Sequence, residues 1–199
     1  MSILTTASGL LLDLNEGDHV EFGYKIKIAD IAHHLALINR FCGATMVPYS
    51  VAQHSLVVVR ILEQMDAHPR TCLWGLLHDA HEAYLGDIPT PAKRALFGMN
   101  DAVPSEFDDV SEFIDMALWR KLWGGKPDRK IDNQAVALAD AVALCTEWRD
   151  LMPTPWASSQ PAPASFAIKP MSWSLAEEKF LETYHRLCQL SGLNPDNLK

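Results

Sequence analysis

The stretch from Leu73 to Pro91, LWGLLHDAHEAYLGDIPTP, constrains the fold more than any other part of the chain. Its apolar residues recur at the spacing of a buried helix, and Gly86 is typical of the residue that ends such a helix. Asp87 and the prolines that follow it predict an irregular turn. The sequence therefore predicts a helix inside the core, followed by a tight loop.

This apolar helix carries four polar side chains, His78, Asp79, His81 and Glu82, which are costly to bury without partners. His78 and Glu82 are four positions apart and share one face of a helix, with Asp79 beside them. Two adjacent ligand-type residues and a carboxylate one turn later could hold a divalent metal and activate its water. The His-Asp pair alone does not separate this site from a chance pair in the core, so further ligands must come from other helices.

Two candidates for these further ligands lie on strongly apolar predicted helices. His54 stands in YSVAQHSLVVV, and Asp140 stands in AVALADAVALC. An aspartate flanked by alanine, leucine and valine needs a partner if it is buried. Two imidazoles and two carboxylates make a donor set that suits a divalent transition metal. The sequence therefore predicts a metal site formed by His54, His78, Asp79 and Asp140.

The whole pattern predicts an all-α fold of six to seven helices with a minor N-terminal β hairpin. We expect the hairpin strands at 10–14 and 20–28, around a turn at 15–18. We expect helices at 28–41, 50–65, 73–85, 91–97, 105–123, 128–151 and 173–190.

The length of 199 residues and the absence of repeats predict a single domain over 1–199. Its core would be 28–151, followed by a loop at 152–170, where five prolines break helical periodicity, and a C-terminal helix at 173–190.

Composition limits the partners and the compartment. A net charge of −8 argues against binding to a nucleic acid polymer, and no apolar run reaches membrane-spanning length. The N-terminus lacks the basic region of a signal peptide. The four cysteines are widely spaced, which argues against a zinc ribbon and fits a reducing compartment. We therefore expect a cytoplasmic protein without a membrane partner.

The order of His54, His78-Asp79 and Asp140 resembles the H…HD…D signature of the HD-domain metal-dependent phosphohydrolases. The segments DIAHHLALINRFCG, PYSVAQHS and LLHDAHEAYLGDIPTPAK are similar to the small members of this family that act on deoxynucleotides. That group includes bacterial 5′-deoxynucleotidases and phage dATP triphosphohydrolases. The resemblance extends from about Ile28 to Asp150.

The resemblance implies roles for individual residues. His54, His78, Asp79 and Asp140 would be the metal ligands. Glu82 would orient or deprotonate the attacking water. Asp87 would lie near the 5′ leaving oxygen as a general acid, although a carboxylate after glycine is also ordinary turn chemistry.

The resemblance also implies substrate contacts by Arg40, Phe41, Lys93 and His81. Arg40 would bind phosphate, and Phe41 would pack near the nucleoside, although the bacterial nucleotidase has tryptophan there. Lys93 would clamp phosphate and His81 would face a triphosphate. The alternatives for these residues are a surface cation at a helix end for Arg40 and purely structural packing for Lys93 and His81.

The activity implied first is a dATP triphosphohydrolase that releases deoxynucleoside and tripolyphosphate. The alternative is a 5′-deoxynucleotidase that converts a deoxynucleoside monophosphate to deoxynucleoside and phosphate. A non-catalytic nucleotide-binding regulator is a further alternative. The cofactor would be one divalent ion, zinc, cobalt or manganese, and a second divalent ion could accompany a triphosphate. The resemblance also implies a homo-oligomer, a dimer or a hexamer, and the host cytoplasm as the location if the chain is phage-encoded.

Overall fold

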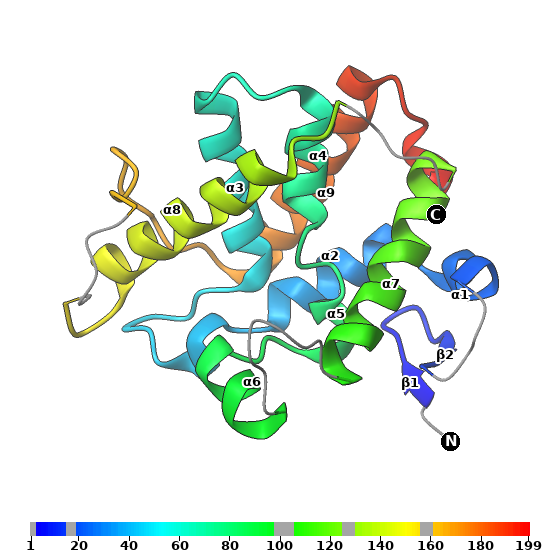
Figure 1. The fold of residues 1–199 in the computed structure, drawn as a ribbon, viewed down its shortest axis with the longest axis horizontal. Coiled ribbons are helices and arrows are strands. Elements are labelled where there is room, and N and C mark those ends of the chain that lie inside the picture. Colours follow the sequence, from blue (N-terminus) through cyan, green and yellow to red (C-terminus); the bar gives the residue numbers. More distant parts are fainter. Residues whose placement is uncertain (1–2, 15–18, 98–105, 125–129, 156–160) are drawn as a thin grey trace.

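The computed structural model describes residues 3–14, 19–97, 106–124, 130–155 and 161–199, and these are mostly helical (Figure 1). The predicted all-α class with a minor β hairpin is confirmed. The elements are β1 (Ile3–Thr5), β2 (Leu11–Asp13), α1 (His19–Lys25), α2 (Ile28–Leu37), the 3-10 helix η1 (Arg40–Gly43), α3 (Val51–Gln64), α4 (Pro69–Leu77), α5 (Glu82–Leu85), α6 (Thr90–Phe97), α7 (Glu106–Trp123), α8 (Asn133–Leu151), α9 (Trp173–Ser191) and the 3-10 helix η2 (Pro195–Leu198).

The hairpin lies earlier in the chain than the sequence predicted. β1 pairs antiparallel with β2, so that Leu4 lies opposite Leu12. Gly9, at a φ of 80°, allows the chain to reverse between the two strands. The turn predicted at 15–18 lies outside the described residues.

The strand expected at 20–28 is wrong, because this segment contains α1 and the start of α2. Phe22 and Ile26 are fully buried, and the Phe22 ring meets the Phe113 ring of α7 edge to face at 5.1 Å. Apolar residues four positions apart are compatible with a helix as well as with a short strand. Packing of α1 along α7 decides in favour of the helix (Figure 1).

Helices α3, α4 and α8 form the part of the core that positions the site, with α8 crossing α3 (Figure 1). Ser50 caps α3 as predicted, since its side chain accepts a hydrogen bond from the Gln53 backbone N–H at 3.2 Å. A side chain at Gly75 of α4 would clash with Leu62 of α3, so glycine lets these two helices approach closely.

The helix predicted at 73–85 is interrupted at the His-Asp motif. α4 ends at Leu77, and α5 begins only at Glu82. Between them the backbone tightens to bonds three residues apart, from Ala80 N–H to the Leu77 carbonyl and from Glu82 N–H to the Asp79 carbonyl. Such a tight segment inside a helical run often marks a functional site.

The described parts of the 152–170 loop contain no helix or strand. The Arg149 guanidinium of α8 holds the loop by donating to the carbonyls of Ala164 and Phe166. The Gln53 side chain of α3 donates to the Lys169 carbonyl at 2.8 Å and accepts from the Met171 N–H at 3.1 Å. These contacts anchor the described parts of the loop to α8 and α3.

None of the helices in the described ranges combines the length and the hydropathy that crossing a membrane requires.

Candidate metal centre

His54 lies near the start of α3 and is fully buried. Its Nδ1 atom is 2.6 Å from Oε1 of Glu147, which is also fully buried. Since an ionised carboxylate only accepts hydrogen bonds, Nδ1 carries the proton and donates it to Glu147. In the neutral ring the lone pair is therefore on Nε2, which faces the neighbouring helices.

His78 directly follows the last residue of α4 and is held by the same kind of bond. Its Nδ1 atom donates to the Gly75 carbonyl at 2.8 Å, and a carbonyl oxygen can only accept. The lone pair of neutral His78 is therefore on Nε2 as well. Neither Nε2 atom, of His54 or of His78, has a hydrogen-bond partner among the described residues, although both atoms are buried.

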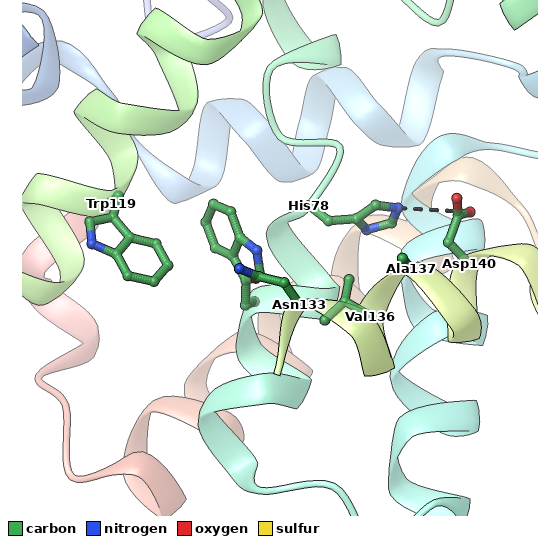
Figure 2. Close-up of a pocket in the computed structure, with 7 residues that line it drawn as sticks. His78, Trp119, Asn133, Val136, Ala137 and Asp140 are labelled. Carbon is green, nitrogen blue, oxygen red and sulfur yellow. Dashed lines mark ion pairs between the residues drawn. The ribbon is translucent and has the colours of Figure 1, made fainter. Parts of the chain in front are cut away.

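Asp140 completes this group from α8. Its Oδ1 atom lies 3.1 Å from Nε2 of His54 and 3.9 Å from Nε2 of His78. Figure 2 shows the side chains of His78 and Asp140 pointing toward each other. One ligand atom of each of the three residues lies within 4.8 Å of the others, so the group could hold a metal ion. Two imidazole nitrogens and a carboxylate oxygen fit zinc, cobalt or manganese.

Asp79, the fourth predicted ligand, lies at the edge of this group. Its Oδ2 atom is 3.2 Å from Nε2 of His78 and 3.5 Å from Nε2 of His54. It also lies 3.6 Å from Nη1 of Arg40. Burial opposes its charge, but the imidazole of His78 and the other neighbouring cations hold the pKa of Asp79 well below its usual range. The structure thus brings the four residues together, with Asp79 shared between the imidazoles and a guanidinium.

Glu147 is a residue that the sequence reasoning missed. Besides His54, its carboxylate accepts a hydrogen bond from the Tyr49 hydroxyl at 3.0 Å and one from Arg40 Nε at 3.2 Å. Burial raises the pKa of Glu147, but Arg40 and His54 outweigh it and keep the pKa below its usual value. Burial likewise opposes the charge of His54, and the carboxylates of Glu147 and Asp140 raise its pKa to about 10.

Glu82 and Asp87, the predicted catalytic carboxylates, lie in a different electrostatic setting. Burial, followed by repulsion from Asp79 and Asp87, raises the pKa of Glu82 to about 9. Its Oε2 atom is buried and has no hydrogen-bond partner in the described part of the chain. Burial also raises the pKa of Asp87, although Arg40 and Lys93 partly offset this. Both groups therefore hold a proton more readily than solvated carboxylates do.

Arg40 is mostly buried, with 12% of its side chain exposed, so it is not the surface cation that one alternative described. The helix predicted to reach Phe41 ends at Leu37, and the chain enters η1. Phe41 and Cys42 adopt φ values of 56° and 51°, which are strained for side chains other than glycine. The Phe41 ring lies edge to face with Trp148 at 5.8 Å, and the Arg40 guanidinium lies 5.4 Å from its centre.

The other two predicted substrate contacts have partners inside the protein. Nδ1 of His81 lies 3.2 Å from Oδ1 of Asp115 on α7, which agrees with the structural alternative for this residue. The Lys93 ammonium lies 4.8 Å from the centre of the Phe107 ring, yet it still influences Glu82 and Asp87. The structure therefore places Lys93 near the two acids and His81 within hydrogen-bond distance of Asp115.

The comparisons with known proteins identify relatives. No family model matches the chain. The chain is 34% identical over 170 residues to the uncharacterized protein YfdR of Escherichia coli K12. The aligned region covers 83% of this chain and 86% of that protein. It is also 43% identical over 95 residues to an uncharacterized protein of Rhodobacter capsulatus, and this aligned region covers 45% of each chain.

Proposed function

We propose that this chain, which belongs to the family of the Escherichia coli protein YfdR, is a metal-dependent phosphohydrolase of 2′-deoxynucleotides. One observation carries the proposal: His54 and His78 each bind a fixed acceptor through Nδ1 and direct an unpartnered Nε2 toward Asp140. Two imidazoles fixed through Nδ1 that direct Nε2 toward one carboxylate form the arrangement in which histidines bind a metal ion.

His54, His78 and Asp140 would hold the ion, with Asp79 as a fourth ligand. A bound divalent ion would supply a water of lowered pKa and would neutralise charge on the phosphate. Glu82 would then orient that water and accept its proton, because added positive charge near Asp79 and Asp87 favours the ionised form of Glu82. Asp87, which retains its proton more readily than a solvated aspartate, would donate to the departing 5′ oxygen.

Two cations would bind the phosphates. Arg40 approaches from η1 and Lys93 from α6, and both lower the pKa of Asp87. Cations on two separate elements support a polyphosphate substrate, and we place dATP first because of the family resemblance. The products would be deoxynucleoside and tripolyphosphate.

A deoxynucleoside monophosphate is the second candidate substrate, and a specific observation favours it. Arg40 already pairs with Asp79 and with Glu147, and the unpartnered Oε2 of Glu82 faces the same site. A triphosphate would add several negative charges to this acidic setting, whereas a monophosphate would add fewer.

Incubation with a panel of deoxynucleoside mono- and triphosphates, with zinc, cobalt or manganese, separates these possibilities by chromatography. Tripolyphosphate from dATP supports the leading proposal, and orthophosphate from monophosphates alone supports the second candidate. The Glu82→Ala variant should lose turnover and still bind nucleotide. If the wild type binds nucleotide but forms no product from any substrate with any of the three ions, the result would instead favour the non-catalytic regulator.

A further inference from the structure

A pocket of about 540 Å³ opens beside the candidate metal centre and is lined by residues of α4, α7 and α8 (Figure 2). Its volume lies within the range of roughly 300–1,000 Å³ that is typical of small-molecule sites. His78 and Asp140 form one end of the pocket, so any molecule in it would lie next to the metal group. We name this pocket the indole slot, after the two tryptophans, Trp74 and Trp119, that line it.

One wall of the indole slot is a single face of α8. Asn133, Val136, Ala137 and Asp140 follow the three- and four-residue spacing that brings helix residues into one row. Figure 2 shows Asn133 and Asp140 at opposite ends of this row. Seven residues of helix span about 10 Å, which sets the distance from the metal ligand to the amide.

The indole rings form another part of the lining. Trp74 lies one helical turn before His78 on α4, and Trp119 comes from α7. Their rings meet edge to face at 5.0 Å, and Trp119 also packs on Trp123 at 4.7 Å. Such contacts hold the rings in place, and a partly buried Trp119 offers a preformed surface for stacking.

Apart from His78 and Asp140 at one end, the described lining contains indole rings, aliphatic groups and one amide, and it contains no lysine or arginine. Phosphate groups would find no cation there, whereas Arg40 lies on the Asp79 side of the centre. A flat ring with hydrogen-bonding edges suits this lining, because it can stack on indole while its edge meets the Asn133 amide. An alkyl chain would leave the amide without a partner.

We propose that the indole slot binds the nucleobase of the nucleoside leaving group, while the phosphates lie on the Arg40 side of the metal centre. The placement of the phosphates on the Arg40 side rests on the proposed function, whereas the binding of a base in the indole slot does not. Phe41, which packs on Trp148, would then not be the main contact of the base.

The test is calorimetric titration with 2′-deoxyadenosine, which has no phosphate and needs neither metal nor turnover to bind. Ala137 is exposed in the lining, so Ala137→Leu should fill the slot without disturbing the core. Gln134→Leu makes a similar change at an exposed position of α8 that does not line the slot. We expect Ala137→Leu to weaken binding by roughly 10-fold or more and Gln134→Leu to leave it unchanged.

Trp119→Ala should weaken the same binding by roughly 5- to 150-fold, since a base loses its stacking partner. Circular dichroism of each variant checks folding. Equal affinity of the wild type, Ala137→Leu and Trp119→Ala, or no binding of 2′-deoxyadenosine by the wild type, would overturn the proposal.

A kinetic arm separates this proposal from the proposed function. If 2′-deoxyadenosine binds and Ala137→Leu blocks it while no nucleotide is hydrolysed, the slot stands and the phosphohydrolase proposal fails. If dAMP and 2-deoxyribose 5-phosphate are hydrolysed equally well, and Ala137→Leu affects neither, the phosphohydrolase stands and the slot proposal fails.

Discussion

The carboxylates around the candidate metal centre fall into two regions that each contain one buried and one partly buried member but have opposite pKa shifts. In the holding region, Asp140 and Glu147 have pKa values below the usual range. In the acid region, Glu82 and Asp87 have pKa values above it. Because burial raises the pKa in both regions, the difference comes from the partners of each carboxylate.

The holding region has imidazoles and a guanidinium within ion-pair distance of its carboxylates. Asp140 faces His54, and Glu147 faces both His54 and Arg40. In the acid region, Arg40 and Lys93 lower the pKa values of both carboxylates but do not outweigh burial. Carboxylates pushed in opposite directions are typical of sites in which one set binds and another transfers protons. This division matches the roles that we propose for the two regions.

The largest expected effect comes from removing a ligand in the holding region. His54→Ala should lose bound metal and turnover, because the remaining donors, His78, Asp79 and Asp140, include only one imidazole. Metal content by mass spectrometry checks this. His185→Ala, an exposed histidine on α9, is the matched control and should keep its metal. Full metal occupancy in His54→Ala would show that His54 is not a metal ligand and that α3 contributes no ligand to the site.

In the acid region, Glu82→Gln should lower kcat by roughly 10²- to 10⁴-fold, the usual contribution of a general base. Metal content should stay at the wild-type value, because Glu82 belongs to the proton-transfer set. Comparing kcat with metal stoichiometry in one preparation makes the division between the regions measurable. Loss of metal together with activity would show that Glu82 is a ligand and that the division is wrong.

Glu147→Gln should weaken metal binding by roughly 10- to 100-fold, as expected for a partner that orients a metal-binding histidine. Competition with a chelator gives the affinity. Glu63→Gln changes an exposed glutamate on α3 that pairs with Arg186, so it provides the control. An unchanged affinity in Glu147→Gln would mean that the bond to His54 does not determine the ligand geometry.

The smallest effect is a pH dependence of stability in protein treated with a chelator. An unfolded glutamate loses its proton near pH 4.5, whereas folded Glu82 keeps it to about pH 9. The folded state therefore binds more protons between these values, and the wild type should lose stability as pH rises through this window. Glu82→Gln should remove at least about 1 kcal/mol of that loss. Urea unfolding of both proteins at pH 6 and pH 9 measures the difference, and parallel pH profiles would contradict the shift.

The sequence was sufficient to identify the three residues that come together as a candidate metal group, for a physical reason. His54 and Asp140 stand out because each is a polar side chain within an otherwise apolar helix. Ser50 and the ends of α3 were equally predictable, since a cap depends on local chemistry.

What the sequence did not reveal depends on tertiary contacts. Glu147 lies near the polar end of α8, where a glutamate normally faces solvent, and only its seven-residue spacing from Asp140 places it on the same face. The break of the helix at His78–His81 and the folding of 19–25 as α1 instead of a strand likewise follow from packing. The indole slot combines residues from α4, α7 and α8, which no local pattern connects.

Anomalous diffraction from crystals grown with zinc, cobalt or manganese, recorded at the absorption edge of the metal, tests the central claim most directly. We expect one peak about 2.0–2.2 Å from Nε2 of both His54 and His78 and close to a carboxylate oxygen of Asp140. A peak elsewhere, or none at any of the three edges while the three side chains keep their present positions, would contradict the account.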